Sequence, residues 1–346
     1  MHKLAVVTYS VALMLMVGWL AVIGQSIILP VLVGVIAVYI LTTAAEAMAQ
    51  VPVIGLLPRR GRRLLVLVGF TVSFMVLASF ITSNATTISA SILEYRDNFD
   101  VLQDNFLHFL GVRSVPNWAN LSEYLVELVD VTNLMPVALS TISSGGSVIV
   151  AAALYAVFLL AELDTLPDKT RRAMGDPHQA EQTLDIVRRI NERIGGYLAA
   201  KTLVNVVLGL VSYMFLILLG IEHPAFWAIL IGLLNYIPYI GSIIAVVFPV
   251  TMSLIQFASF GHALIALVVL VIPQMIVGYY VEPKFLGRSV NLSPFTVLLS
   301  LAIWTALWGM MGAILAIPLT AMVVIILAEI PTTRFIAVMM SDTGEL

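Results

Sequence analysis

The sequence predicts an all-α polytopic membrane protein with about eight hydrophobic segments. Hydrophobic residues make up 60% of its 346 residues and charged residues only 11%, whereas a soluble domain has about 25% charged residues. The mean hydropathy is +1.04. So few charges do not cover a soluble surface of this size, so the chain belongs to the proteins that cross a bilayer several times. The lack of cysteine excludes disulfides, thiolate metal sites and cysteine nucleophiles.

Six apolar runs have the length of an ordinary membrane span, which is about 20 residues. They cover 4–23, 27–45, 64–82, 146–161, 202–219 and 261–281. A signal peptide is the alternative interpretation of the first run. No clear small-x-small cleavage site follows that run, and a second apolar run begins at Ile27. We therefore expect two helices here, joined by a tight turn at the sequence GQS.

Two further apolar stretches, 225–256 and 294–328, are too long for one straight span. At ~1.5 Å per residue, a 32-residue helix is about 48 Å long, against a hydrocarbon core of about 30 Å. Each stretch is interrupted near its middle, the first by NYIPYIG at 235–241 and the second by WGMMG at 308–312. Each is therefore either one long tilted helix or a hairpin of two half-helices.

Basic residues favour the hairpins, because cytoplasmic loops carry an excess of Lys and Arg. The sequence RRGRR at 59–63 places the 46–63 loop and the N-terminus inside. The 83–145 segment then lies outside and 162–201 inside. If both long stretches return to their starting side, the 282–293 loop with its Lys284 and Arg288 also lies inside, together with the C-terminal tail. Two full crossings remain the alternative.

The hairpins would create an inverted repeat of 202–256 and 261–328, an architecture that secondary transporters use to build sites near the bilayer midplane. We accordingly expect five regions. These are N-terminal spans (1–82), an extracytoplasmic helical insertion (83–145), a span with a cytoplasmic helix (146–201), a transport core (202–330) and a cytoplasmic tail (331–346).

Two polar segments show helical periodicity. In 84–145, apolar residues from Ile88 to Phe109 recur at alternating spacings of four and three, which predicts a long packed helix. A similar stripe runs from Leu121 to Met135. These helices pack either within one subunit or against a neighbouring subunit. The segment 178–198 is amphipathic, and we expect it to lie at the membrane surface and lead into the next span.

The interruption NYIPYIG is the main candidate binding site. Pro238 breaks a helix, and an unwound tip is tolerated at membrane depth only where it is buried or lines a cavity. Asn235, Tyr236 and Tyr239 would then contact a polar solute, with Pro238 and Gly241 shaping the tip. The alternative is a proline kink whose tyrosines lie at the membrane interface.

Other polar groups in the apolar regions are few. The amides of Asn205 and Gln274 are either part of a binding site or hydrogen-bonded links between helices. Glu282 begins the sequence VEPKFLGR and is the best candidate for a coupling carboxylate, with Lys284 and Arg288 as partners. A plain cytoplasmic turn is the alternative. Gly309 and Gly312 are candidate gating positions in the second interruption.

No enzyme, cofactor or metal motif is present. The chain has no nucleotide-binding loop, no HExxH sequence and no nucleophile paired with a base. We therefore expect no enzyme activity, no cofactor and no nucleic-acid partner. Transport would depend on a gradient or on facilitated diffusion.

Three motifs resemble the autoinducer-2 exporter family of bacterial membrane proteins. They are LLNYIPYIGSIIAVVFPV (233–250), VEPKFLGRSVNLSPFTVLLSLAIW (281–304) and GMMGAILAIPLTAM (309–322). The resemblance implies a bacterial inner-membrane protein with cytoplasmic termini that assembles as a homo-oligomer, a pentamer. It also implies export of the quorum-sensing signal autoinducer-2, or sodium (lithium)/proton antiport.

Three functions therefore stay open. The first is export of a small polar solute such as autoinducer-2, which hydroxyl and amide partners suit. The second is exchange of a monovalent cation for protons, for which Glu282 is the best carboxylate available. The third is a structural or regulatory membrane oligomer whose broken helices are only kinks.

Overall fold

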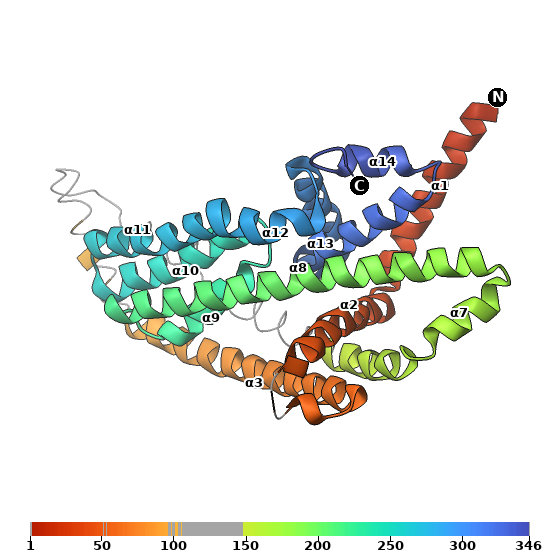
Figure 1. Cartoon of the computed structure of the whole chain (residues 1–346). Coiled ribbons are helices and arrows are strands. Elements are labelled where there is room, and N and C mark those ends of the chain that lie inside the picture. Colours follow the sequence, from red (N-terminus) through yellow and green to blue (C-terminus); the bar gives the residue numbers. More distant parts are fainter. Residues whose placement is uncertain are drawn as a thin grey trace. The chain divides into compact units, whose positions relative to one another are not determined.

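The structure is a computed structural model that describes residues 2–50, 52, 54–95, 98, 101, 102, 105 and 148–345 (Figure 1). Among these residues every regular element is helical, apart from an isolated bridge between Leu292 and Ser341. Most of the predicted packing helices of 84–145 lie outside the described residues, including the whole stripe from Leu121 to Met135.

The described helices confirm an all-α polytopic membrane protein. Six of them are long and apolar enough to cross a bilayer. These candidates are Gln25–Gln50, Arg59–Asn84, Pro177–Leu218, Ile240–Phe257, Phe260–Phe285 and Pro294–Glu329. A seventh span exists if the helix Val148–Glu162 and the following helix, bent by 71°, count as one.

The chain divides into two compact units. Unit 1 contains Met1–Ser73, Gly145–Ala200 and Leu286–Leu346. Unit 2 contains Phe74–Ser144 and Lys201–Phe285.

Unit 1 begins with two helices separated by a single residue, Gly24, as the predicted turn requires. They are α1 (His2–Ile23) and α2 (Gln25–Ala47). Two short 3₁₀ turns, Met48–Gln50 and Ile54–Leu56, lead to α3.

The helices that follow vary in length. Helix α3 runs from Arg59 to Glu94 and so continues beyond the predicted span 64–82. The helix Val148–Glu162 then leads to α7 (Leu166–Met174), which ends at Gly175 with a left-handed φ of 66°. Glycine adopts this conformation without steric cost.

Helix α8 (Pro177–Leu218) corrects one prediction. The sequence predicts a helix at the membrane surface over 178–198, but this segment and the span after it form one continuous helix. Ile190, Ile194 and Leu198 are buried in unit 1 among residues of α2 and α13. The apolar stripe therefore packs against protein and not against lipid, because α2 and α13 offer it an apolar surface to bury.

In unit 2 the stretch 225–256 is a hairpin, as predicted. Helix α9 (Pro224–Leu234) and helix α10 (Ile240–Phe257) are separated by the NYIPY residues. The rings of Trp227 and Phe248 stack with their centroids 6.4 Å apart. On one straight helix these residues would be about 32 Å apart, so the chain folds back on itself.

The tip of this hairpin is tightly packed. A Cβ at Gly241 would overlap the carbonyl oxygen of Leu234, so only glycine fits there. Tyr239 has a φ of 59°, a conformation that is strained for a residue with a side chain. These two residues let the chain reverse within five positions.

Unit 2 continues with α11 (Phe260–Ile276), which packs beside α10. The Ser259 hydroxyl caps α11 by accepting a hydrogen bond from the His262 backbone nitrogen. A π-helical turn, Val277–Val281, follows and leads directly into α12 (Glu282–Val290). Such turns widen the helix and occur often at functional sites.

In unit 1 the stretch 294–328 is also broken. Helix α13 (Pro294–Glu329) has non-helical dihedral angles at Trp308 and Gly309. The Trp304 indole nitrogen donates to the Thr320 hydroxyl over 2.9 Å, although 16 residues of straight helix span about 24 Å. The two halves of α13 therefore fold together as a second hairpin, and α14 (Arg334–Met340) follows it.

Candidate functional site

The candidate site is a group of four polar residues in unit 2, which we call the polar cluster: Lys201, Asn205, Asn235 and Glu282. Lys201 and Asn205 lie one turn apart on α8, so they share a helix face. Asn235 is the first residue after α9, at the hairpin tip. Glu282 begins α12 immediately after the π-helical turn. The cluster thus joins α8, the broken helix and the start of α12.

Hydrogen bonds connect all four side chains. The Asn235 amide nitrogen donates to Asn205 Oδ1 over 2.8 Å and to Glu282 Oε1 over 3.3 Å. The Lys201 ammonium donates to the same Glu282 oxygen and forms an ion pair with it. Beside the cluster, the Thr202 and Tyr236 hydroxyls are hydrogen-bonded at 2.7 Å.

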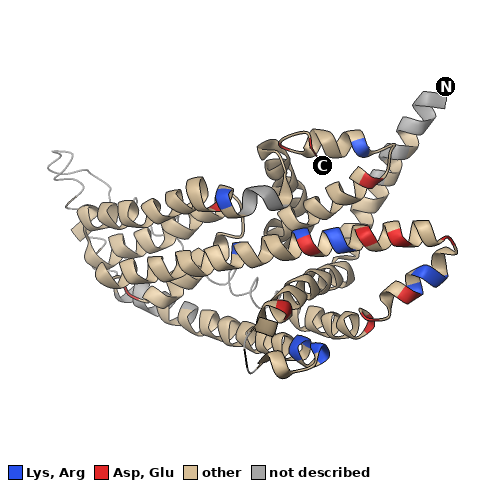
Figure 2. Ribbon diagram, in the orientation of Figure 1, with Lys and Arg blue, Asp and Glu red and all other residues tan. Residues whose placement is uncertain are grey.

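The cluster is buried in apolar surroundings. Lys201 and Asn205 are each 4% exposed, whereas the Glu282 side chain is 28% exposed. Figure 2 shows that α9, α10 and α11 carry no Asp, Glu, Lys or Arg. An ion pair whose lysine is buried among apolar helices costs desolvation free energy, so its presence here indicates a functional site.

Some hydrogen-bonding capacity of the cluster is unused. Within the described part of the chain, the buried Asn205 Nδ2 has no partner. Glu282 Oε2 likewise forms no hydrogen bond to the described residues, and both bonds to this carboxylate end on Oε1. A donor and an acceptor are therefore available to a guest molecule.

The structure brings together Asn205, Asn235 and Glu282 from the predicted site residues, and places Tyr236 beside them. Tyr239, also predicted, is 55% exposed and lies outside these hydrogen bonds. Pro238 and Gly241 form the turn without contributing polar side-chain atoms. Both amide atoms of Gln274 are buried and have no partner among the described residues.

Two of the remaining predicted positions, both glycines, lie outside the polar cluster. Gly309 and Gly312 form the break of α13 in unit 1. A Cβ at Gly312 would overlap the Trp304 carbonyl oxygen, so this hairpin repeats the packing seen at Gly241. The side chain of Arg288 lies outside the described residues.

The structure gives Glu282 a partner that the sequence did not suggest. Its ion pair among the described side chains is with Lys201, 81 residues away, and not with the neighbouring Lys284, while the predicted partner Arg288 stays a prediction because its side chain lies outside the described residues. Lys201 is the last residue of the 162–201 segment that is expected inside, where it has the character of an ordinary cytoplasmic charge. The signal that would have identified it is its place one turn before Asn205, at the start of an apolar run.

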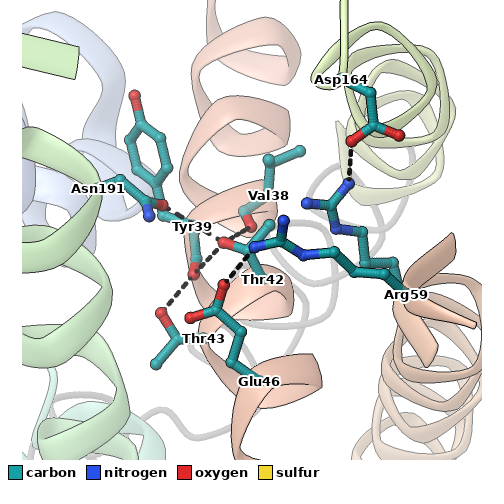
Figure 3. A network of polar contacts seen from close by, with 9 residues as sticks. Val38, Tyr39, Thr42, Thr43, Glu46, Arg59, Asp164 and Asn191 are labelled. Atoms are coloured by element: carbon teal, nitrogen blue, oxygen red, sulfur yellow. Dashed lines mark hydrogen bonds and ion pairs between the residues drawn. The ribbon is translucent and has the colours of Figure 1, made fainter. Parts of the chain in front are cut away.

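A second polar network lies in unit 1 and links helices to one another. Figure 3 shows Arg59 facing Glu46, and these exposed side chains pair over 3.0 Å. Asp164, between the helix Val148–Glu162 and α7, accepts hydrogen bonds from Arg60 and Arg63, each over 3.0 Å. These bonds hold the pKa of Asp164 below its usual value. The two bonds to Asp164 link the start of α3 to the turn that precedes α7.

Comparison with known proteins identifies the family. The sequence profile of the AI-2E family transporters matches residues 9–332. The chain belongs to this family. It is 28% identical to the AI-2 transport protein TqsA of Escherichia coli (strain K12), over the full length of both chains.

Two other relatives are named only as putative transport proteins. The one from Haemophilus influenzae is 28% identical over 93% of this chain and 92% of its own. The one from Borreliella burgdorferi is 31% identical over 70% of this chain and 66% of its own. The AI-2E relatives are thus named for transport, a role that is not enzymatic, and the apolar helices make this chain a membrane protein.

Proposed function

We propose that this protein exports a small polar solute such as autoinducer-2, driven by a gradient or by facilitated diffusion, and that the solute binds at the polar cluster. The observation that carries the proposal is the buried meeting of two amides and an ion pair at the tip of a broken helix. Transporters place their solutes at such interruptions, where polar groups are available at membrane depth.

The chemistry of the cluster suits a neutral polyhydroxylated solute. Lys201 and Glu282 balance each other in charge, so an uncharged guest leaves the cluster neutral. Asn205 Nδ2 offers a donor, and Glu282 Oε2 offers an acceptor. A hydroxyl group is both donor and acceptor, so a solute with several hydroxyls satisfies both positions. The E. coli relative is named as an AI-2 transport protein, which favours autoinducer-2.

The resemblance of the motifs to the family supports the cellular setting. We place the protein in the bacterial inner membrane, surrounded by lipid bilayer, with both termini in the cytoplasm. The same resemblance supports a homo-oligomer, a pentamer. An inverted repeat of 202–256 and 261–328 completes this proposal, with the two hairpins entering from opposite faces.

Uptake of labelled autoinducer-2 into proteoliposomes tests the proposed function. We expect Asn235→Ala to reduce uptake at least tenfold, because it removes both bonds that reach Asn205 and Glu282. Ser253→Ala is the matched control, since its buried hydroxyl lies elsewhere in unit 2. Uptake that is unchanged in Asn235→Ala, or absent from the wild-type protein, would contradict the proposal.

Sodium (lithium)/proton antiport is the second candidate, and the buried Lys201–Glu282 pair favours it. Antiport needs a carboxylate that binds a cation and a proton in turn, and Glu282 has one oxygen without a partner among the described residues. Sodium-driven proton movement in proteoliposomes, abolished by Glu282→Gln and without autoinducer-2 uptake, would establish this function instead.

A further inference from the structure

The start of α3 carries a dense positive charge. Arginines occupy four of the first five positions of this helix, and we call them the basic patch: Arg59, Arg60, Arg62 and Arg63. Figure 2 shows this charge in blue at the beginning of α3. The first turn of the helix contains no acidic residue. Any counter-charge therefore comes from elsewhere in unit 1 or from outside the protein.

Two carboxylates of unit 1 neutralise part of the basic patch. Glu46 forms an ion pair with Arg59. Asp164 is shared between Arg60 and Arg63. Among the described residues, the fourth arginine of the patch donates only to backbone carbonyl oxygens. Four guanidinium groups thus pair with two carboxylates, so two positive charges have no counter-charge in the described part of the chain.

The basic patch has a buried layer and an exposed layer. The side chain of Arg63 is 7% exposed and is paired with Asp164. The side chains of Arg59 and Arg60 are 63% and 81% exposed. The two outer guanidinium groups are therefore accessible to a ligand, and the inner ion pair does not have to break when a ligand binds.

An exposed apolar stripe continues from Arg60 along α3. Leu64, Val68 and Val72 follow this arginine at intervals of four residues, which places all four side chains on one ridge of the helix. Each of the three apolar side chains is more than half exposed. From Arg60 to Val72 the ridge is about 18 Å long. One leaflet of a bilayer has a hydrocarbon thickness of about 15 Å, so the stripe matches the depth of one leaflet.

The helix that carries this stripe is open to lipid. Of the six candidate spans among the described residues, Arg59–Asn84 has the smallest buried share, 11% of its most apolar stretch. A positive group at the end of an apolar span lies at the level of the lipid headgroups. Guanidinium groups bind phosphate oxygens through paired hydrogen bonds. A phospholipid therefore complements both the patch and the stripe.

The unmatched charge selects among phospholipids. A zwitterionic headgroup carries its own cation, which cancels the charge of its phosphate, whereas an anionic headgroup brings net negative charge to the patch. The 46–63 loop is expected on the cytoplasmic side, and basic clusters next to a span on that side attract anionic lipids.

We propose that the basic patch binds the phosphate of an anionic phospholipid, with an acyl chain lying along Leu64, Val68 and Val72. Arg59 and Arg60 contact the phosphate oxygens. The inference does not depend on the identity of the transported solute, and it adds a lipid ligand to unit 1.

Native mass spectrometry of the purified full chain in detergent tests the site. Phosphatidylglycerol is titrated into the wild type and into Arg59→Gln/Arg60→Gln, a variant that keeps the buried Arg63–Asp164 pair. We expect the Kd of the first bound lipid to rise about thirtyfold in this variant, because each arginine near an anionic lipid surface contributes about fivefold in affinity.

Arg171→Gln/Arg172→Gln is the matched control. These two exposed arginines lie on α7 in the same unit, and their replacement changes the net charge by the same amount. The control variant should bind phosphatidylglycerol like the wild type. An equal loss of affinity in both double variants would show a general effect of net charge and would overturn the proposal.

The apolar stripe has a test of its own. Leu64→Ser should raise the Kd for phosphatidylglycerol about fivefold, because it removes apolar surface that the acyl chain covers. An unchanged Kd would overturn the placement of the acyl chain. Inorganic phosphate distinguishes a lipid from a free phosphate, and phosphate that displaces the lipid at a similar concentration would overturn the assignment to a lipid.

The wild type alone supplies a comparison that needs no variant. Phosphatidylglycerol should bind about tenfold more tightly than phosphatidylcholine, and this preference should shrink as the ionic strength rises, because salt screens the charges. Equal affinities for the two lipids, or no lipid bound to the wild type, would overturn the proposal.

Discussion

Asn235 connects three elements through one amide nitrogen. That nitrogen donates to Asn205 on α8 and to Glu282 at the start of α12, while its backbone ends α9. Each bond to a charged group contributes about 1.5–3 kcal/mol, and each neutral one about 1 kcal/mol. The position of the hairpin tip therefore depends on the polar cluster, so a substitution in the cluster should shift or loosen the tip.

Lys201→Met tests the ion pair, because methionine keeps an apolar stem and removes the charge. Loss of one partner of a buried pair costs about 3–5 kcal/mol, and the partial exposure of Glu282 favours the lower end. We expect a lower thermal unfolding midpoint in detergent. The double variant Lys201→Met/Glu282→Gln should recover most of the loss, and a double variant as unstable as the single one would contradict the pairing.

Asp164 is expected to contribute to stability in a pH-dependent manner. Hydrogen bonds from Arg60 and Arg63 lower its pKa in the folded state. A lowered folded pKa stabilises the protein above the unfolded pKa, about 3.9, and this stabilisation is lost as the pH falls through the folded value. The difference in unfolding midpoint between wild type and Asp164→Asn should therefore be constant above about pH 5 and shrink below it. A difference that grows on acidification would contradict this.

At the residue level the sequence predicted part of the site. Asn205, Asn235 and Glu282 stood out as polar groups in apolar runs, and the structure brings them within hydrogen-bonding distance. Lys201 was missed because a lysine at the end of a basic segment looks like an ordinary cytoplasmic charge. Its partner is 81 residues away, and a single sequence does not reveal such a long-range pair.

At the level of elements, the two broken helices share the same close contact between a glycine and a backbone carbonyl. In each hairpin a glycine faces a carbonyl oxygen of the preceding half-helix, Gly241 facing Leu234 and Gly312 facing Trp304. Length and composition predicted both breaks, because a 32-residue apolar stretch is too long for one span. They did not predict the continuity of α8, which runs from an amphipathic segment into a span through the pair Gly195 and Gly196.

Gly241→Ala tests this packing. The added methyl group would overlap backbone atoms, which cannot shift without opening the tip, so we expect destabilisation on the order of 1–3 kcal/mol. Gly69→Ala is the matched control, since that helical glycine has no neighbouring atoms within 4 Å and alanine favours helix. Equal unfolding midpoints for the two variants would show that the tip is looser than the structure indicates.

At the level of the whole molecule, the proposed orientation depends on the placement of basic residues. The chain has no cysteine, so single cysteines report their side of the membrane without background. Gly287→Cys should react with a membrane-impermeant maleimide only when the cytoplasmic face is open, because the 282–293 loop is expected inside. Labelling from the outside of intact cells would contradict the hairpin topology.

The central claim is that the transported solute binds at the polar cluster of an AI-2E family transporter. Alkylation of Thr202→Cys measures this directly, because Thr202 is exposed beside the cluster and hydrogen-bonds to Tyr236. Gln182→Cys, near the start of the same helix, is the control. The account predicts that saturating autoinducer-2 slows the alkylation of Thr202→Cys at least fivefold, which corresponds to a protection free energy on the order of 1 kcal/mol. The alkylation rate of Gln182→Cys should not change. Equal alkylation rates at Thr202→Cys with and without autoinducer-2 would contradict it.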